Sequence, residues 1–294
     1  MKHLKGYILL GIVYLFAVQP FFLLRRWRDL IFLMLYYVIG YRKKVVMENL
    51  RNSFPEKSEE ELEHIARKFY FHLSNLVIET LAFFRLSSRN MLRRIKFHNT
   101  ELLEKLYDKQ KNIVLVMGHY GMWEWMLVMP KIMRHTGVVV YKPLNDRFFD
   151  EFMKRKRTQY GGYAFSMRDT LRGLIEVTRK GNPWLAAFVA DQTPTGNEIN
   201  FWVKFLSQDT PVFLGPEKIA KRFGAAVVYA EMRPAGNNRY NVYFDLITEM
   251  PEKEPEGKIT VQFNQMLEQT IRKAPQYWLW SHRRWKHKHL KDKK

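Results

Sequence analysis

Ile113-Val-Leu-Val-Met-Gly-His-Tyr-Gly-Met-Trp-Glu124 is the most informative stretch of this sequence. Its first five residues are apolar and rich in β-branched side chains, which predicts a buried strand. Gly118 ends the strand, so His119 lies at its carboxyl end, where open α/β sheets bind their ligands. Glu124 follows about one helical turn later, and a tight bend at Gly121 would bring its carboxylate back to the imidazole.

An imidazole with a carboxylate beside it suits general-base catalysis. The carboxylate fixes the tautomer of the ring and stabilises the imidazolium, while the other ring nitrogen removes a proton from a hydroxyl. A His followed by a Glu is also common as an ordinary structural pair. From His119 and Glu124 alone, both readings therefore stay open.

Further strands and helices alternate along the chain and predict its fold class. Residues 137–141 and 184–190 are β-branched or apolar runs, and a helix dense in cations is expected over 145–160. The second run delivers Asp191 and Gln192 to the carboxyl edge of the sheet, although an Asp at that position is also a common turn former. We expect an α/β fold with a single, mainly parallel, mixed sheet and flanking helices.

The composition calls for an anionic partner. The 294 residues contain 49 Lys and Arg against 29 Asp and Glu, a net charge of +20, which suits nucleic acid, a phospholipid surface, a phosphorylated substrate or an acidic carrier protein. Aromatic residues make up 15% of the chain, which favours a membrane interface over a DNA groove. There are no cysteines, so thiolate nucleophiles and Cys-based metal sites are excluded.

The N-terminal region carries two apolar segments. Residues 6–24 have no formal charge and come close to the ~20 residues that cross a bilayer, although a buried core helix is the alternative. The denser cations after this run predict that the bulk of the chain stays on the cytoplasmic side. Residues 30–41 are too short to span and suit an amphipathic helix, in the interface or packed under the globular part. We therefore expect a membrane part, 1–45, and a catalytic domain, 46–294.

Separated motifs along nearly the whole chain resemble the late acyltransferases of lipid A biosynthesis, the lauroyl and myristoyl transferases, within the wider glycerol-phosphate acyltransferase-like group. The central stretch resembles their G-H-x-G-N-W-E motif, with Met122 in place of Asn. The other matching segments are Asn49-Leu-Arg-Asn-Ser-Phe-Pro55, Arg157-Thr-Gln-Tyr-Gly161, Asp191-Gln192 and Pro275-Gln-Tyr-Trp-Leu-Trp-Ser-His-Arg-Arg-Trp-Lys286. The long loop expected over 193–214 has Phe205-Leu-Ser207 where the family ends in F-F-G.

The resemblance implies acyl transfer from acyl carrier protein to a hydroxyl of an acylated, phosphorylated glucosamine disaccharide at the inner membrane. His119 would be the general base, held by Glu124. With no Cys in the chain and no Ser in the motif, a ternary complex is favoured over an acyl-enzyme. The resemblance implies no cofactor, and the tail residues His287 and His289 lack the third ligand that a metal site needs.

The remaining site residues expected from the resemblance have binding roles. Arg157 would bind a phosphate or the developing oxyanion, and Asp191 and Gln192 would contact substrate. Backbone amides of the loop from Gly118 to Gly121 are the expected oxyanion donors.

Two alternative functions stay open from the sequence. A lysophospholipid, an amino-acid lipid or a pigment could be the acceptor, with the same residues and mechanism. A non-enzymatic basic protein that binds membrane or nucleic acid would instead tolerate replacement of His119 and Glu124. Of these partners we expect the carrier protein, the anionic glycolipid and the membrane surface, and no nucleic acid.

Overall fold

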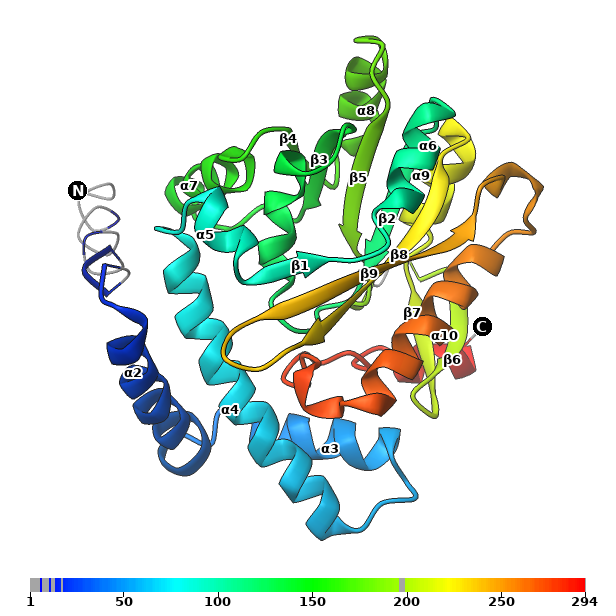
Figure 1. Cartoon of the computed structure of the whole chain (residues 1–294). Helices are drawn as coiled ribbons and strands as arrows, with labels where there is room; N and C mark the ends of the chain where they lie inside the picture. Colours follow the sequence, from blue (N-terminus) through cyan, green and yellow to red (C-terminus); the bar gives the residue numbers. More distant parts are fainter. Residues whose placement is uncertain (1–5, 7–10, 12–13, 17, 196–198, 294) are drawn as a thin grey trace.

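The computed structural model describes residues 6, 11, 14–16, 18–195 and 199–293, which form a seven-stranded sheet with helices packed around it and a separate two-stranded hairpin (Figure 1). The strands are β1 (Ile95–Phe97), β2 (Ile113–Met117), β3 (Thr136–Tyr141), β4 (Tyr163–Ser166), β5 (Trp184–Val189), β6 (Phe201–Phe205), β7 (Gln208–Val212), β8 (Ala226–Pro234) and β9 (Tyr240–Thr248). The predicted α/β class is confirmed.

The α-helices are α2 (Phe21–Leu33), α3 (Lys43–Ser53), α4 (Glu59–Phe83), α5 (Ser88–Leu92), α6 (Glu101–Asp108), α7 (Arg147–Thr158), α8 (Thr170–Thr178), α9 (Gly215–Phe223) and α10 (Lys258–Lys273). A π-helix, η1 (Met34–Val38), continues α2, and short 3₁₀ helices are η2 (Trp123–Lys131), η4 (Pro251–Lys253), η5 (Pro275–Tyr277) and η6 (Lys288–Lys293). α4 begins with a full capping box, because Ser58 and Glu61 each bond the other's backbone N–H.

The large sheet has the strand order β1-β9-β8-β2-β5-β3-β4. Neighbouring strands are parallel except for β8 and β9, which form an antiparallel pair, so the prediction of a mainly parallel, mixed sheet is confirmed. β2 lies between β5 and β8, and all five of its residues are buried. A strand covered on both faces reads as a continuous apolar run, which is the pattern seen in the sequence.

The side chains of β2 divide the core in two. Val114 and Val116 enter a cluster that includes residues of α3, α4, α9 and α10 and the C-terminal tryptophans. Ile113, Leu115 and Met117 enter a second cluster with residues of α6, η2 and β9. Because successive residues of a strand point to opposite faces, this one segment anchors both cores and fixes the position of the loop that follows it.

Part of the expected long loop over 193–214 is an antiparallel hairpin of β6 and β7. Its two-residue turn is Leu206-Ser207, and both residues have positive φ values, 48° and 60°. This is the backbone of a type I′ hairpin turn, which usually carries Asn or Gly. The sequence signal for a hairpin was therefore absent, and the prediction of a loop over these residues was wrong.

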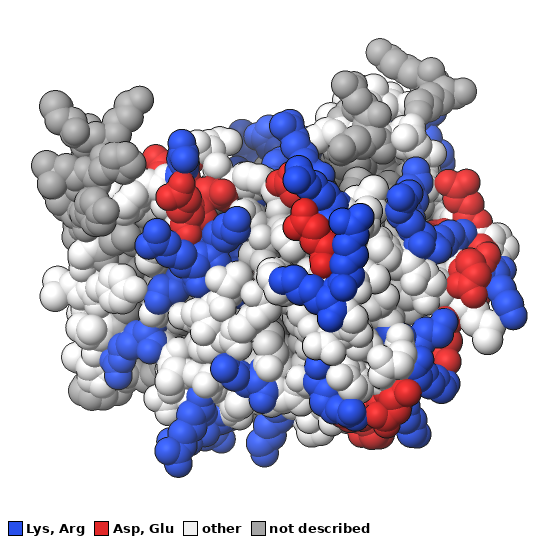
Figure 2. Space-filling view, turned by 90° about the horizontal axis from the view of Figure 1, so that it is seen from above, with Lys and Arg blue, Asp and Glu red and all other residues white. Residues whose placement is uncertain are grey.

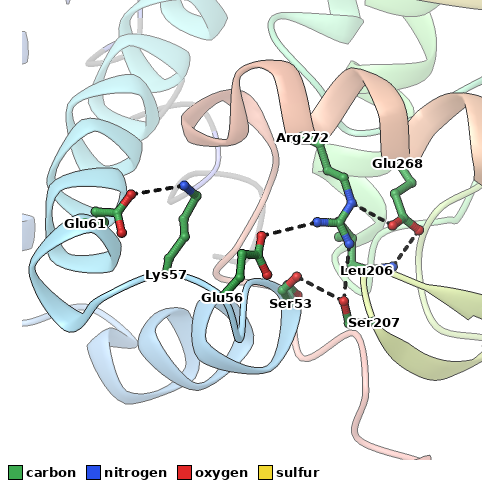
Figure 3. Close-up of polar contacts among 8 residues, drawn as sticks. All are labelled: Ser53, Glu56, Lys57, Glu61, Leu206, Ser207, Glu268 and Arg272. Carbon is green, nitrogen blue, oxygen red and sulfur yellow. Dashed lines mark hydrogen bonds and ion pairs between the residues drawn. The ribbon is translucent and has the colours of Figure 1, made fainter.

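Side-chain bonds hold this turn against α10 and the end of α3 (Figure 3). The Leu206 backbone N–H donates to Glu268 at 2.7 Å, and Arg272 donates to the Ser207 hydroxyl at 3.2 Å. Arg272 also pairs with Glu268 at 2.8 Å and with Glu56 at 3.6 Å. The hairpin, the last long helix and the α3–α4 connection thus form one connected region.

The N-terminal helix α2 and its continuation η1 lie along α4 (Figure 1). Arg28 sits over the Phe71 ring at 4.3 Å, and the Tyr36 and Tyr70 rings meet at 5.4 Å. The opposite side of α2 exposes large apolar side chains, among them Trp27 and Leu30. The segment expected over 30–41 is thus helical and packed against the globular part.

Within the residues that the structure describes, the predicted membrane-spanning helix over 6–24 is not found. Across the described ranges (6, 11, 14–16, 18–195 and 199–293), no helix is long and apolar enough to cross a membrane. The predicted segment falls in part outside the described residues. Within the described part, Val18 and Gln19 form a turn and bend, and Pro20 has an extended backbone as the N-cap of α2. Proline has no backbone N–H to bond the preceding helical turn, so Pro20 divides the apolar run.

Candidate active site

His119 and Asp191 lie at the same edge of the sheet because their strands are parallel neighbours. Met117 at the end of β2 pairs in register with Val189 at the end of β5, and the Ala190 N–H bonds the Met117 carbonyl at 3.0 Å. His119 follows Met117 by two residues, and Asp191 follows Val189 by two residues. The two side chains therefore lie at the same height along the sheet edge. The prediction that both reach one carboxyl edge is confirmed.

The imidazole of His119 is held by Asp191. Its Nδ1 lies 2.5 Å from Asp191 Oδ1, and its Nε2 lies 3.0 Å from the amide nitrogen of Gln192. A carboxylate accepts only, so Nδ1 carries the proton and Nε2 keeps its lone pair, which receives the Gln192 N–H. The ring is therefore poised as a base at Nε2.

Asp191 is kept charged in spite of its burial, with only 2% of its side chain exposed. Burial opposes the charged form, but the positive charge available on His119 and three hydrogen bonds outweigh it and lower the pKa of Asp191 to about 2. Two of these bonds reach Oδ2, from the His119 backbone N–H at 2.8 Å and from Trp278 Nε1 at 2.7 Å. The carboxylate thus stays ionised at neutral pH.

Glu124 does not hold the imidazole, which corrects the expected pairing. The chain turns at Gly121 (φ +60°) and then winds as the 3₁₀ helix η2. This places the Trp123 ring against His119, at 4.8 Å between centroids, and the Glu124 carboxylate 3.5 Å from Arg157 Nη2. A tighter 3₁₀ turn in place of an α-turn aims the carboxylate at α7.

Arg157 is the cation of α7 that the sequence predicts as a binding residue, and its side chain is largely buried. Its side chain is 12% exposed, pairs with Glu124 and stacks over the Tyr141 ring at 4.8 Å, at the end of β3. Its Nη1 is buried and has no hydrogen-bond partner. By contrast, Arg155 on the same helix is exposed. A buried donor without a partner is costly, which makes this guanidinium a candidate to bind an anionic group.

Most of the expected oxyanion donors in the loop are already used. The N–H groups of His119, Tyr120 and Gly121 donate to Asp191, to the Gly118 carbonyl at 2.8 Å and to the Tyr277 carbonyl at 3.1 Å. The role expected for Gly121 is corrected accordingly, because its N–H is engaged and its positive φ makes the turn. Gly118 leaves no space for a side chain, since a Cβ there would meet Leu267 Cδ1 at 2.6 Å, and its role as a donor stays a prediction. Two side-chain donors at this edge are candidates for the oxyanion: the Gln192 amide, which contacts His119 Nε2, and the unpartnered Arg157 Nη1.

Trp278 and Tyr141 were not predicted as site residues. Trp278 belongs to the Pro275–Lys286 segment, which resembles the family's C-terminal motif. Its tryptophans were the available signal, because a buried indole N–H needs an acceptor. Met122, which replaces the family's Asn, is 1% exposed and packs in the second core cluster, so it offers no polar contact.

Comparison with known proteins agrees with the motifs. A sequence model of the bacterial lipid A biosynthesis acyltransferases matches residues 1–287. The chain is 26% identical over 252 residues to the lipid A biosynthesis palmitoleoyltransferase of Escherichia coli K12, covering 83% of this chain and 79% of that protein. The lauroyltransferase of the same strain is 25% identical over 251 residues, with the same coverage. A lipid A biosynthesis acyltransferase of Haemophilus influenzae Rd is 24% identical over 249 residues, 83% and 78% of the two chains.

The family match covers almost the whole chain, and the His119–Asp191 pair provides a base of the kind that acyl transfer to a hydroxyl needs. The chain therefore belongs to the bacterial lipid A biosynthesis acyltransferase family and is an acyltransferase.

Proposed function

We propose that this enzyme moves a fatty acyl chain from an acyl carrier protein thioester to a hydroxyl of an acylated, phosphorylated glucosamine-based lipid A precursor. The observation that carries the proposal is the pairing of His119 Nδ1 with the Asp191 carboxylate at 2.5 Å, which assigns the proton to Nδ1 and leaves Nε2, 3.0 Å from the Gln192 amide nitrogen, as the basic nitrogen. The family match and the names of the relatives support a lipid A precursor over a lysophospholipid or a pigment.

In the proposed reaction the acceptor hydroxyl takes the place of Gln192 at Nε2 and attacks the thioester carbonyl. His119 accepts the hydroxyl proton, and the Asp191 carboxylate stabilises the resulting imidazolium. The C–S bond breaks when the tetrahedral intermediate collapses, and the imidazolium returns the proton to the departing thiolate of the carrier. The displaced Gln192 amide becomes available to the developing oxyanion.

Arg157 is suited to a phosphate of the acceptor. Glu124 holds one side of the guanidinium, while the buried Nη1 has no partner. A planar fork that is already oriented by a carboxylate and an aromatic ring can make paired bonds to phosphate oxygens. We assign Arg157 to acceptor binding and Glu124 to holding it.

A small cavity beside the catalytic loop, about the size of one water molecule, marks where an acyl chain would enter if the surrounding side chains move apart. It lies directly behind His119, because Gly118 and Trp123 contribute to its wall. Most of its lining is apolar: Met117, Gly118, Tyr120, Trp123, Met126, Tyr229, Ala230, Met232 and Thr270. Methionine side chains adapt to irregular apolar ligands, so a hydrocarbon tail fits this lining better than a polar substrate does.

Membrane association is proposed from the outer face of α2 and η1. Leu23, Trp27, Leu30, Met34 and Tyr37 recur at helical spacing and are exposed. Arg25, Arg26 and Lys44 flank them. An apolar face with cations beside it suits the surface of an anionic membrane. We place the enzyme at the inner membrane with residues 1–45 as its membrane part and the catalytic domain, 46–294, in the cytoplasm.

The net charge of +20 also suits an acidic carrier protein. Lys and Arg side chains are spread widely over the face seen in Figure 2, with fewer acidic side chains among them. Such a surface attracts an anionic partner over a distance of about 10 Å at 0.1 M salt. Docking of acyl carrier protein is therefore expected to weaken as salt rises.

The test of the proposed function is mass spectrometry of lipid A from a strain that lacks this gene. We expect lipid A of the deletion strain to be lighter by one acyl chain. The wild-type gene should restore the missing chain, and the gene for the His119→Ala variant should not. Unchanged lipid A in the deletion strain, with a change in another membrane lipid, would assign the enzyme to a different acceptor. Restoration by the His119 variant would favour the non-enzymatic reading.

The Arg157→Lys variant should impair transfer clearly, because an ammonium cannot make the paired bonds of the guanidinium. We expect KM for the phosphorylated acceptor to rise by about tenfold or more, which corresponds to the loss of one charge-assisted bond. The control is Arg155→Lys, on the same helix and exposed, which should leave the kinetics unchanged. Equal, mild effects at both positions would remove Arg157 from the site.

Deletion of residues 1–24 should release the enzyme from carbonate-washed membranes, because only the part of α2 from residue 25 onward and η1 then remain to bind the surface. The shortened chain should still sediment with anionic vesicles at low salt, since the exposed face of α2 from Trp27 onward is intact. Western blotting of washed membranes measures the first effect. Retention of the shortened chain after the carbonate wash would show that the segment 30–41 is the true anchor.

A further inference from the structure

The carboxylate of Asp191 is fixed by the C-terminal segment of the chain as well as by His119. Trp278 donates its indole N–H to Oδ2 at 2.7 Å, from a position 87 residues further along the chain. Oδ2 also accepts the His119 backbone N–H, which leaves Oδ1 for the imidazole. The indole thus helps to decide which oxygen faces the ring.

The segment that carries Trp278 is joined to the catalytic loop itself. Tyr120 and Trp278 form an antiparallel bridge, and the Gly121 N–H donates to the Tyr277 carbonyl at 3.1 Å. The Trp278 ring is 3% exposed and packs edge-on against Trp280 at 4.7 Å. Its position is therefore set by backbone bonds on one side and by aromatic packing on the other.

The far side of the segment is held by α3. The buried Asn49 side chain donates to the carbonyls of Trp280 at 2.8 Å and His282 at 3.0 Å, and Arg42 donates to the Ser281 carbonyl at 3.0 Å. Two segments that resemble family motifs, 49–55 and 275–286, are thus connected by these bonds. These bonds fix the backbone directly after Trp278.

We propose that Trp278 is a positioning residue for acyl transfer, which acts through Asp191 by holding its Oδ2 so that Oδ1 meets His119 Nδ1. The inference rests on the proposed role of His119 as the base. Loss of the indole N–H makes the Asp191 carboxylate more basic and leaves its Oδ1 less firmly oriented toward His119 Nδ1. A more basic carboxylate stabilises the imidazolium more strongly, and a poorly aimed one holds the ring less firmly.

The chain offers a matched control, because three buried tryptophans of this segment each donate one side-chain hydrogen bond. Trp278 bonds Asp191, whereas Trp280 bonds the Pro275 carbonyl at 2.6 Å and Trp285 bonds Thr210 Oγ1 at 2.7 Å. Substitution by Phe removes an indole N–H and part of the ring at each position. Only the Trp278 change removes a hydrogen bond to the catalytic pair. Trp280 packs against the Trp278 ring at 4.7 Å, whereas the Trp285 ring lies at 6.0 Å, so Trp285→Phe is the control.

The experiment is the pH dependence of kcat for the wild-type enzyme, Trp278→Phe and the control Trp285→Phe. For Trp278→Phe, we expect kcat to fall by roughly 10- to 100-fold, the change that follows loss of a hydrogen bond to a charged group, with little change in KM. The acid limb of its profile should move to higher pH. His282, Arg284 and Tyr229, which also interact electrostatically with Asp191, are retained in both variants, and Trp285→Phe should keep the wild-type acid limb.

A second variant separates the hydrogen bond from the packing. Benzothienylalanine at position 278 replaces the N–H by sulfur and keeps the shape of the ring, so the protein keeps its core even if Trp278→Phe does not fold. The same loss of kcat and the same shifted limb would support the proposal. A wild-type acid limb and a wild-type kcat in the position-278 variants would overturn the role of Trp278. In that case, an inactive His119→Ala enzyme would still support the proposed function. An active His119→Ala enzyme would overturn both proposals.

Discussion

Substitution of His119 by alanine is expected to lower the turnover of acyl transfer by roughly 10²–10⁴, the usual contribution of a general base. The reason is the state of the ring: Asp191 accepts the Nδ1 proton, so Nε2 is the basic nitrogen at the sheet edge. Without the imidazole, no side chain bonded to Asp191 can take the hydroxyl proton. The fold should persist, because the His119 side chain keeps 15% of its surface exposed and is no part of either core cluster.

The measurement is kcat with an acyl carrier protein thioester and a phosphorylated acceptor. A suitable control is His98→Ala, which removes a partly buried histidine bonded to Asn241 at 3.1 Å, next to β1 and β9. This control should keep its turnover. Near-full activity of His119→Ala, with lipid A acylation intact, would contradict the assignment of the base.

Asp191→Asn is expected to have an effect of about the same size or larger, of order 10⁴ by analogy with the Asp→Asn change in the Ser-His-Asp triad. The Asp191 oxygens accept three N–H bonds. In asparagine, the oxygen can keep the bonds from Trp278 and the His119 backbone, which turns the amide NH₂ toward Nδ1. The ring then takes the other tautomer, with its proton on Nε2, where the base is needed.

Glu124→Gln provides the comparison for this prediction. Glu124 pairs with Arg157 and not with the ring, so its loss should raise KM for the phosphorylated acceptor more than it lowers kcat. Steady-state kinetics of the two variants, measured side by side, separate the roles. A deeper loss of kcat in Glu124→Gln than in Asp191→Asn would restore Glu124 as the partner of the base.

The sequence predicted the sheet and its functional edge because the signals were local. Apolar runs ending in Gly118-His119 and in Ala190-Asp191 indicated two core strands, and parallel strands share a carboxyl edge. What the sequence could not show is that β2 and β5 are direct neighbours. Without the strand order, the nearest carboxylate in sequence, Glu124, was taken as the partner of His119 in place of Asp191, 72 residues away.

Two other features depended on contacts between distant segments. Leu206 and Ser207 adopt positive φ without the Gly or Asn that announces a hairpin, and bonds from Glu268 and Arg272 hold them there. The loop amides were expected to be free, but the C-terminal segment supplies the acceptor for Gly121. Such tertiary bonds leave no periodic or compositional signal in the chain.

The most direct test of the central claim is the ¹⁵N NMR spectrum of His119 in the labelled enzyme at neutral pH, assigned by its absence from His119→Ala. We expect a protonated Nδ1 and an unprotonated Nε2, a pattern that Glu124→Gln should retain and Asp191→Asn should reverse. A proton on Nε2 in the wild-type enzyme, or a pattern that changes with Glu124 and not with Asp191, would contradict it.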